Sequence, residues 1–261
     1  SAEDLSFGKE LVGLCRAKDL DSIGKLLANK FYERSYISDI DDYLDHHTDE
    51  LIFKSGIADK SIDELADMVT KLEFEAFDKV QNEGGRASCQ DDYHTFSIMR
   101  KSQYLTWDKD MLMQYLYDFD REFKLGHNLI TEKYGRMMES TAPERYAEIK
   151  DSFPFVNDEK KAIIEAIIAM QVKRREDFAR KYPKLSNRAR LIHTSEDTPY
   201  ETSFETYLRG EMMTYSDKML ELYARYVIAH ENNDESITEE TMLNSVKLYG
   251  YDSLDEAENK A

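Results

Sequence analysis

The chain has 261 residues, of which 41% are hydrophobic and 34% are charged, a balance typical of a globular protein with a highly charged surface. Its 35 basic and 53 acidic residues give a net charge of −18, which argues against nonspecific binding to nucleic acid or to anionic membranes. No apolar run is long enough for a transmembrane helix, and the N-terminus lacks the basic and apolar regions of a signal peptide. Because Cys15 and Cys89 are the only cysteines and make no disulfide framework, we expect a cytoplasmic protein.

The first part of the chain predicts small helices. Two are expected within residues 1–35, and a third covers residues 38–55. No low-complexity linker separates these helices from the rest of the chain. We expect an N-terminal helical subdomain of residues 1–70 beside a main helical domain of residues 71–261.

Apolar residues recur at helical spacing in four later segments, residues 61–81, 108–126, 160–182 and 203–231. Asn157 and Asp158 offer N-cap chemistry for the third of these segments. The tyrosines and methionines of the last segment form a wide apolar face, which is typical of a protein core. No alternating strand pattern and no Asn-Gly or Asp-Gly hairpin signal occurs. The sequence therefore predicts an all-α, multi-helix bundle.

Three pairs of similar segments keep their order in the two halves of the chain. Glu75–Phe77 matches Glu176–Phe178, Thr95–Phe96 matches Ser203–Phe204, and Ile130 matches Ile237, at offsets of 101, 108 and 107 residues. Amphipathic helices can also match by chance. The alternative to chance is an internal duplication of residues 71–140 as residues 172–246, which would give the bundle two halves related by a pseudo-twofold axis.

Two polar stretches interrupt the helices at corresponding places of this repeat. In the first, VQNEGGRASCQDDYHTF (residues 80–96), we expect Gly84–Gly85 to cap the preceding helix with at least one positive φ. Asp91–Asp92 should cap the next helix. The second stretch is SNRARLIHTSEDTPYETSF (residues 186–204). Caps do not explain all of the polar residues in these loops, and such loops often carry groups that face a ligand.

A basic segment precedes the second polar stretch. Residues 173–190 contain eight lysines and arginines against two acids. One interpretation is the basic face of a helix that balances an acidic neighbour. The other is an anion-binding lip.

We expect the two loops to form one site for a small anionic or amino-acid-like molecule. Arginines would hold the anion by paired N–H donors. His193 and Glu211 are the candidate general acid or base, although an ordinary surface histidine is the alternative for His193. The expected ligand-binding residues are Gln81, Arg86, Gln90, Asp91, Arg100, Gln103, Arg190, Glu196, Asp197 and Arg209.

Other chemistries are poorly represented. The common phosphate-loop, dinucleotide, nucleophile-elbow and zinc-protease motifs do not occur, so the sequence identifies no cofactor. A cluster of two histidines and three aspartates has the residue types of a metal site, but adjacent histidines on a helix point about 100° apart, and no metal site is predicted. Its members are Asp42, Asp45, His46, His47 and Asp49. The alternative to an enzyme or a ligand-binding protein is a non-catalytic helical scaffold that docks a protein partner.

Four long strings resemble an uncharacterised bacterial family, domain of unknown function 4125 (DUF4125). They are FDKVQNEGGRASCQDD, TFSIMRKSQYLTW, RMMESTAP and HTSEDTPYETSFETYLRGE, and the likeness extends over most of the chain from about residue 70. The resemblance implies no activity, because no chemistry is assigned to the family. The expected residue roles therefore rest on the residues themselves.

Overall fold

The computed structural model describes residues 40–81 and 85–261. Over these residues the protein consists of twelve α-helices and three short 3-10 helices with no strand, so the all-α prediction is confirmed. The two helices predicted within residues 1–35, and the side chains of the histidine pair His46 and His47, lie outside the described part.

The α-helices are α3 (Ile40–Gly56), α4 (Ile62–Asp78), α5 (Tyr93–Tyr104), α6 (Lys109–Lys124), α7 (Leu129–Thr141), α8 (Pro143–Ile149), α9 (Asp158–Lys181), α10 (Pro183–Asn187), α11 (Phe204–Met213), α12 (Asp217–Asn232), α13 (Ile237–Leu248) and α14 (Leu254–Lys260). The 3-10 helices are η1 (Ser88–Asp91), η2 (Lys150–Ser152) and η3 (Thr194–Glu196). The predicted start of α9 is confirmed, since the Asn157 side chain accepts a hydrogen bond from the backbone N–H of Lys160.

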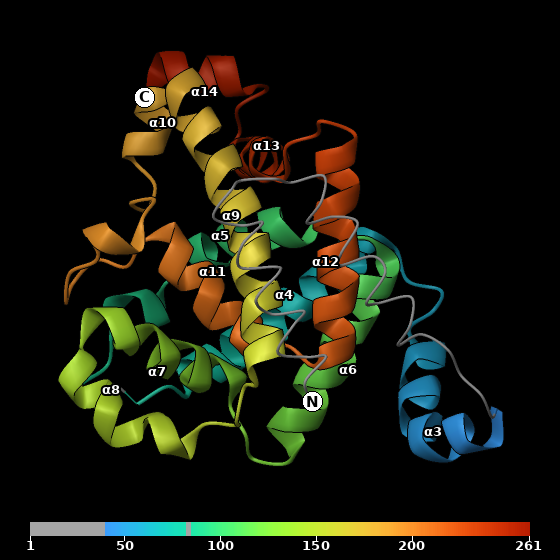
Figure 1. Cartoon of the computed structure of the whole chain (residues 1–261). Coiled ribbons are helices and arrows are strands. Elements are labelled where there is room, and N and C mark those ends of the chain that lie inside the picture. Colours follow the sequence, from blue (N-terminus) through green and yellow to red (C-terminus); the bar gives the residue numbers. More distant parts are fainter. Residues whose placement is uncertain (1–39, 82–84) are drawn as a thin grey trace.

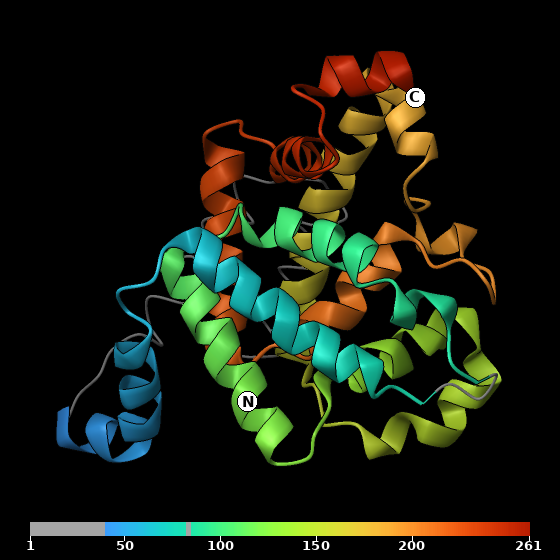
Figure 2. The same ribbon diagram turned by 180° about the vertical axis from the view of Figure 1, so that it is seen from behind.

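The helices pack in two groups. In one group α4 contacts α5, α6 and α7, and in the other α9 contacts α11, α12 and α13. The groups meet where α7 contacts α11, α5 contacts α13 and α6 contacts α12. In Figure 1 α9 lies in front and α4 lies behind it, and in Figure 2, which is seen from behind, α4 lies in front. Helix α3 lies at the edge of the molecule in both views.

The main core lies between the two groups and is rich in aromatic side chains. Trp107 is 2% exposed and is surrounded by the rings of Tyr104, Tyr115, Tyr215 and Tyr223, at centroid distances from 5.0 to 6.4 Å. Most of these pairs are edge-to-face, the arrangement that aromatic quadrupoles favour. Among the helices of the described ranges, none is both long and apolar enough to cross a bilayer.

The segment predicted as one helix over residues 203–231 is two helices, so that prediction is wrong in its detail. Helix α11 ends at Met213 and α12 begins at Asp217. The Ser216 hydroxyl accepts a hydrogen bond from the N–H of Met219 and caps α12, which offers the backbone an alternative to a continuous helix. The tyrosine and methionine face is buried as expected, with Tyr215 and Met219 in the core.

The first polar stretch also differs from its prediction. Helix α4 ends at Asp78 with Lys79 as its C-cap, so the glycine pair does not cap it. Instead, the buried Gln90 side chain donates to the carbonyls of Phe77 and Val80 at the end of α4, at 2.9 and 3.1 Å. Gly85 has a φ of +86°, so the predicted positive φ is confirmed there, while Gly84 lies outside the described residues.

Of the two residues predicted to cap the next helix, α5, one does so and the other does not. The Asp92 side chain accepts from the N–H of Thr95 and caps α5, as predicted, whereas Asp91 pairs with Arg86. The predicted domain boundary at residue 70 falls inside α4, whose buried residues on both sides of that position belong to the same core. A separate N-terminal subdomain stays a prediction.

Candidate functional site

Arg86 joins the first polar loop to the end of α4 through hydrogen bonds. Its guanidinium donates to Asp78 at 2.5 Å, to Asp91 at 2.8 Å and to the carbonyl of Gln90 at 3.0 Å. Gln81 is exposed and donates to the carbonyl of Lys79. These predicted ligand-binding residues thus fasten the loop to the end of α4, and the Arg86 fork is already occupied by carboxylates.

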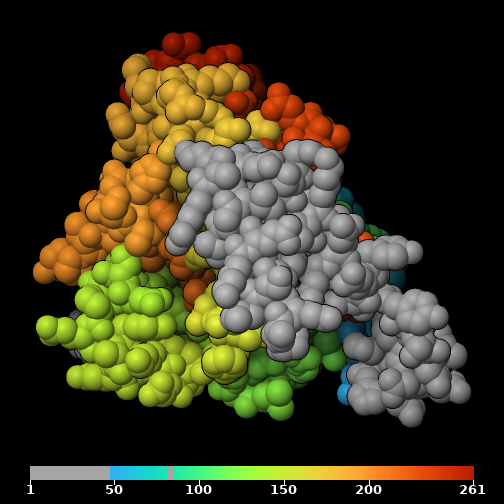
Figure 3. All heavy atoms as spheres, in the orientation of Figure 1, coloured from blue at the N-terminus to red at the C-terminus, as the bar shows by residue number. Residues whose placement is uncertain are grey.

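The second polar loop is held by its own acids. Asp197 accepts from the Ser140 and Thr206 hydroxyls and from the backbone N–H of Ser203, and these bonds outweigh partial burial and lower the pKa of Asp197. Glu196 accepts from the N–H of His193 at 2.8 Å. The connection between α10 and α11, orange in Figure 3, projects at the left edge of the molecule in that view.

His193, a candidate acid or base, lies on this connection with its side chain 41% exposed. Its Nε2 lies 3.4 Å from a carboxylate oxygen of Glu176. No hydrogen bond or ion pair joins His193 to Glu211 or to Arg86 among the described residues. A catalytic role for His193 stays a prediction.

Arg209 lines a hollow of about 530 Å³ between α7, α9 and α11. Its guanidinium binds both carboxylate oxygens of Glu165, at 2.6 and 2.9 Å, and also Glu205 at 2.8 Å. Burial opposes the charge, but the two acids outweigh it and raise the pKa of Arg209. Arg209 is therefore neutralised by protein carboxylates before any ligand arrives.

Arg100, Gln103 and Glu211 lie together in a buried ionic network, although they come from different halves of the chain. Arg100 binds both oxygens of Glu73 on α4, at 2.7 and 2.8 Å, and an oxygen of Glu211 on α11 at 3.0 Å. Gln103 donates to the other oxygen of Glu211 at 3.1 Å. Lys133 on α7 completes the network with a 2.6 Å contact to Glu211. Two acids and two cations thus compensate each other inside the core, as buried charges require.

Glu211 is consequently held as a carboxylate. Burial opposes its charge, but Arg100 and Lys133 outweigh burial and hold the pKa of Glu211 well below its ordinary value. The Tyr215 hydroxyl donates to it as well, at 3.1 Å. As a carboxylate, Glu211 has no proton to donate, and a role as a base would require one of the four donors on its two oxygens to leave.

A second hollow, which we call the Arg175 cavity, lies beside this network between α5, α9, α11 and α13. Its volume is about 220 Å³, and Glu211 and Gln103 line one side of it. Much of the remaining wall is apolar or aromatic and comes from Met99, Trp107, Phe204, Leu208, Tyr223, Ile237 and Met242. Three of the predicted site residues, Gln103, Arg190 and Glu211, thus border one cavity, and no residue of the Arg86 loop lines it.

Arg175 also lines this cavity and is 5% exposed. No carboxylate or hydrogen-bond acceptor contacts its side chain in the part of the chain that the structure describes, and its buried Nε has no partner. The guanidinium carbon lies 5.4 Å from the ring centroid of Phe178. Burial alone lowers the pKa of Arg175, since no acid opposes the effect.

Two further polar side chains of the cavity wall, Gln171 and Arg190, lack some of the hydrogen-bond or acidic partners that they could have among the described residues. Gln171, one turn before Arg175 on α9, is 3% exposed, and its amide has no hydrogen-bond partner among residues 40–81 and 85–261. Arg190 at the exposed side donates to the carbonyl of Thr202 and lies 4.4 Å from the Tyr207 ring, with no acid beside it in the described ranges. Among the described residues, the cavity wall therefore has hydrogen-bond donors without an acceptor, on Arg175 and Gln171, whereas its carboxylate, Glu211, already accepts from four donors.

The basic segment, residues 173–190, is predicted to be either the basic face of a helix that balances acids or an anion-binding lip, and its residues differ in this respect. Arg174 binds Glu231 and Asp234, and Lys181 binds Glu239, as expected for a basic face that balances acids. Arg175 and Arg190 have no acid beside them within residues 40–81 and 85–261, and for these two the anion-binding lip stays a prediction. Sequence analysis marked the segment but missed Arg175, because only its position on α9 decides that it points inward.

A third hollow of about 250 Å³ contains two titratable groups whose pKa values are shifted by burial. Burial raises the pKa of Asp118, which accepts hydrogen bonds from Gln114 and Ser216. Burial also lowers the pKa of Lys160, which donates to the carbonyl of Tyr215. Both groups have partners, so this hollow offers less to a ligand than the Arg175 cavity does.

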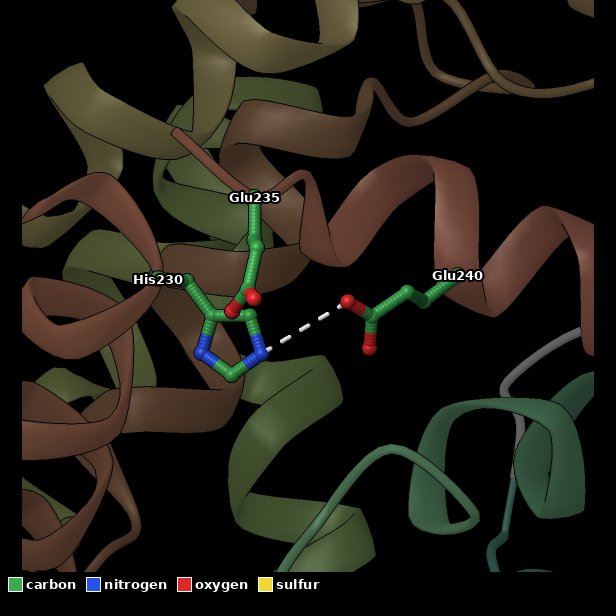
Figure 4. A group of neighbouring side chains, drawn as sticks. All are labelled: His230, Glu235 and Glu240. Carbon is green, nitrogen blue, oxygen red and sulfur yellow. Dashed lines mark ion pairs between the residues drawn. The ribbon is translucent and has the colours of Figure 1, made fainter. Parts of the chain in front are cut away.

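One group of side chains resembles a metal site. His230, Glu235 and Glu240 place one ligand atom each within 4.8 Å of the others, and Figure 4 shows the His230 ring facing both carboxylates. Nδ1 of His230 faces the carbonyl of Tyr226 at 2.9 Å, which leaves Nε2 toward Glu240 at 3.7 Å. Ligands around zinc lie about 3.4 Å apart, given metal–ligand distances near 2.1 Å. The observed spacing fits a His–Glu contact better than a bound ion.

The fold and the cavity define an all-α helical bundle with a compensated ionic network in its core and an uncompensated arginine in a neighbouring cavity. The chain belongs to the family described as "Protein of unknown function (DUF4125)", whose model matches residues 63–259. The resemblance seen in the sequence is thereby confirmed. No curated protein and no solved structure matches the chain.

Proposed function

We propose that this protein binds a small anionic molecule in the Arg175 cavity. The observation that carries the proposal is the buried guanidinium of Arg175, which has no acidic partner in the described part of the chain. Burying an unpaired charge costs several kcal/mol, so buried arginines are ordinarily paired. Every other strongly buried arginine of the described ranges has such an acid, namely Arg100 with Glu73 and Arg136 with Glu132.

The surroundings of the cavity support binding by a preformed site. Glu211 borders the cavity and is fixed by Arg100 and Lys133, so this wall is rigid before a ligand enters. Arg190 lies at the exposed side without an acid and would attract an anion locally. Such local charge matters because the net charge of −18 repels anions at longer range.

The proposal includes an internal duplication with pseudo-twofold related halves. It is supported by α6 and α12, which both have 16 residues and begin 108 residues apart. The predicted matching of the halves pairs α5 with α11 and α7 with α13. Under this matching, the contact between α5 and α13 corresponds to the contact between α11 and α7, and both contacts occur, which also supports the duplication. On this view the cavity lies next to the interface at which a duplicated ancestor would have paired with itself.

The proposal assigns binding and assigns no reaction. Catalysis by His193 or Glu211 stays a prediction, because one is exposed beside Glu176 and the other is held by two cations. We place the binding in the cytoplasm, which the small number of cysteines supports.

Replacing Arg175 tests the proposal through opposite effects on stability and binding. Arg175→Met removes a buried unpaired charge and keeps apolar volume, so the free energy of unfolding of the empty protein should rise by about 1–2 kcal/mol. Binding of anions, followed by thermal shift, should be lost. The matched control is Arg174→Met on the same helix, which breaks contacts with Glu231 and Asp234 and should leave anion binding intact.

Loss of stability in Arg175→Met would show that the arginine has a structural role and would overturn the proposal. The second candidate function, a scaffold for a protein partner, would then gain support. It is favoured by two aromatic side chains on connections, Phe155 at 89% and Tyr200 at 96% exposed. Under that function, replacing these two aromatics would abolish partner binding, while no small anion would stabilise the protein.

A further inference from the structure

We infer that the ligand of the Arg175 cavity is a monocarboxylate with an apolar body about the size of one aromatic ring and no ammonium group. This inference rests on the proposed binding function and narrows its ligand class. It draws on three properties of the cavity, which are its charge, its wall and its volume.

The buried charges around the cavity call for one negative charge, because Arg190, the other arginine of the wall without an acid among the described residues, is exposed and stays hydrated. Arg175 is the buried cation of the cavity wall that lacks an acid among the described residues, whereas the Glu211 carboxylate is balanced by Arg100 and Lys133. A monoanion would compensate Arg175. A phosphate with two charges would bring a second charge against Glu211, which argues against nucleotides and sugar phosphates.

The same balance argues against an amino acid. An ammonium group needs a free carboxylate or several carbonyl acceptors once it leaves water. Glu211 is the carboxylate of this cavity wall, and both of its oxygens already accept from Arg100, Lys133, Gln103 and Tyr215. The sequence-based expectation of a ligand that is either anionic or amino-acid-like is thereby narrowed to the anion.

The polar groups of the wall suit the two oxygens of a carboxylate. Gln171 and Arg175 are four residues apart on α9, so their side chains lie on the same face of the helix. The guanidinium can donate to one or both oxygens, and the unpaired Gln171 amide can donate to one of them. The buried Thr238 hydroxyl, also without a partner in the described ranges, adds a third donor on the α13 side.

The rest of the wall selects an apolar body. Trp107, Phe204 and Tyr223 present rings, and Leu208 and Ile237 present aliphatic groups. A ligand with many hydroxyl groups would lose its water without gaining enough partners. An apolar cavity of about 150 Å³ holds one benzene molecule, so about 220 Å³ fits a ring with a short acid arm.

The test uses the whole protein and compares ligands that differ in one group. Trp107 is the only tryptophan of the chain and lines the cavity, so its fluorescence reports occupancy directly. The ligands are 3-phenylpropionate, its neutral amide, phenylalanine, acetate and inorganic phosphate, each also measured by calorimetry. We expect 3-phenylpropionate to bind about ten- to a hundredfold more tightly than each of the others, since each lacks the single charge or the ring, or adds an ammonium group.

Variants identify the place of binding. Arg175→Met should abolish the binding of 3-phenylpropionate, and Gln171→Leu should weaken it about tenfold. The control is Arg225→Met, which removes an exposed arginine of α12 that pairs with Glu221 and should leave the affinity unchanged.

The outcomes separate the inference from the function on which it rests. If phosphate or phenylalanine binds more tightly than 3-phenylpropionate and Arg175→Met abolishes this binding, the ligand class is wrong and anion binding stands. If the neutral amide binds as tightly as the acid, the charge argument is wrong. If none of the anions binds and Arg175→Met is no more stable than the natural protein, both the inference and the proposed function fail.

Discussion

Arg174 and Arg175 are adjacent on α9, yet their guanidinium groups have opposite surroundings. Two acids surround Arg174 and raise its pKa, whereas burial lowers the pKa of Arg175. Successive helical residues point about 100° apart, so one position decides whether a charge reaches the surface or the interior. Composition alone therefore reveals a basic segment and cannot reveal which of its members lacks a counter-ion.

Asp118 provides a pH-dependent prediction for a single residue. Burial raises its pKa above the ordinary value of 3.8, so the folded state holds the proton more tightly than the unfolded state. This group stabilises the fold only at low pH, and that contribution is lost as pH rises through its folded pKa. We expect Asp118→Asn to match the natural protein below about pH 3.8 and to be the more stable of the two at neutral pH.

Urea denaturation at several pH values measures this difference. The Asn side chain keeps the acceptor for Gln114 and can donate to the Ser216 hydroxyl, so the change mainly removes charge. Equal stability of the two proteins across the whole range would mean that the carboxylate is not penalised by its burial.

Helices α7 and α11 approach each other closely at Gly210. A Cβ atom added there would lie 2.8 Å from Cγ of Met137 and 3.0 Å from the carbonyl oxygen of Lys133. The close approach also brings the Lys133 ammonium to Glu211, the residue after Gly210. The glycine thus lets the two helix groups share one ionic network.

We expect Gly210→Ala to lower the free energy of unfolding by about 1–3 kcal/mol, because the helices must separate. In an open helix the same change would raise stability by up to about 1 kcal/mol. The control is Gly56→Ala at the end of α3, where an added Cβ meets nothing within 4 Å. Chemical denaturation of both variants checks the prediction, and a gain in stability at Gly210 would contradict it.

Helix starts are easier to predict from the sequence than the contacts between helices. Asn157 and Asp92 are recognisable as caps because a cap depends on a few neighbouring residues. The break at Ser216 escapes prediction because the apolar spacing continues through it. The network is only partly predictable. The sequence marks Arg100 and Glu211 as candidate site residues, but their mutual contact spans 111 residues and depends on tertiary packing. Whether the predicted loop residues form a ligand site stays open to experiment.

For the molecule as a whole, the two helix groups share one core around Trp107. Its ring contacts Tyr104 and Tyr115 from one group and Tyr215 and Tyr223 from the other. The ionic network crosses the same interface. Neither group can therefore unfold without exposing the aromatic and charged interior of the other.

We accordingly expect one cooperative unfolding transition for the region from α4 to α13. Fluorescence of Trp107 reports the shared core, and far-UV circular dichroism reports all helices, so their urea midpoints should coincide. Two separated transitions, with half of the helical signal lost before the tryptophan signal changes, would show that the groups unfold independently.

The uncompensated charge of Arg175 has a consequence for how long the protein survives in a cell. Under the proposed function, the empty protein has a buried cation that weakens its folded state, and a bound anion would compensate that charge. Proteases act mainly on opened chains, so the empty form would be degraded faster than the occupied form. The abundance of the protein would then follow the supply of its ligand, with no change in its synthesis.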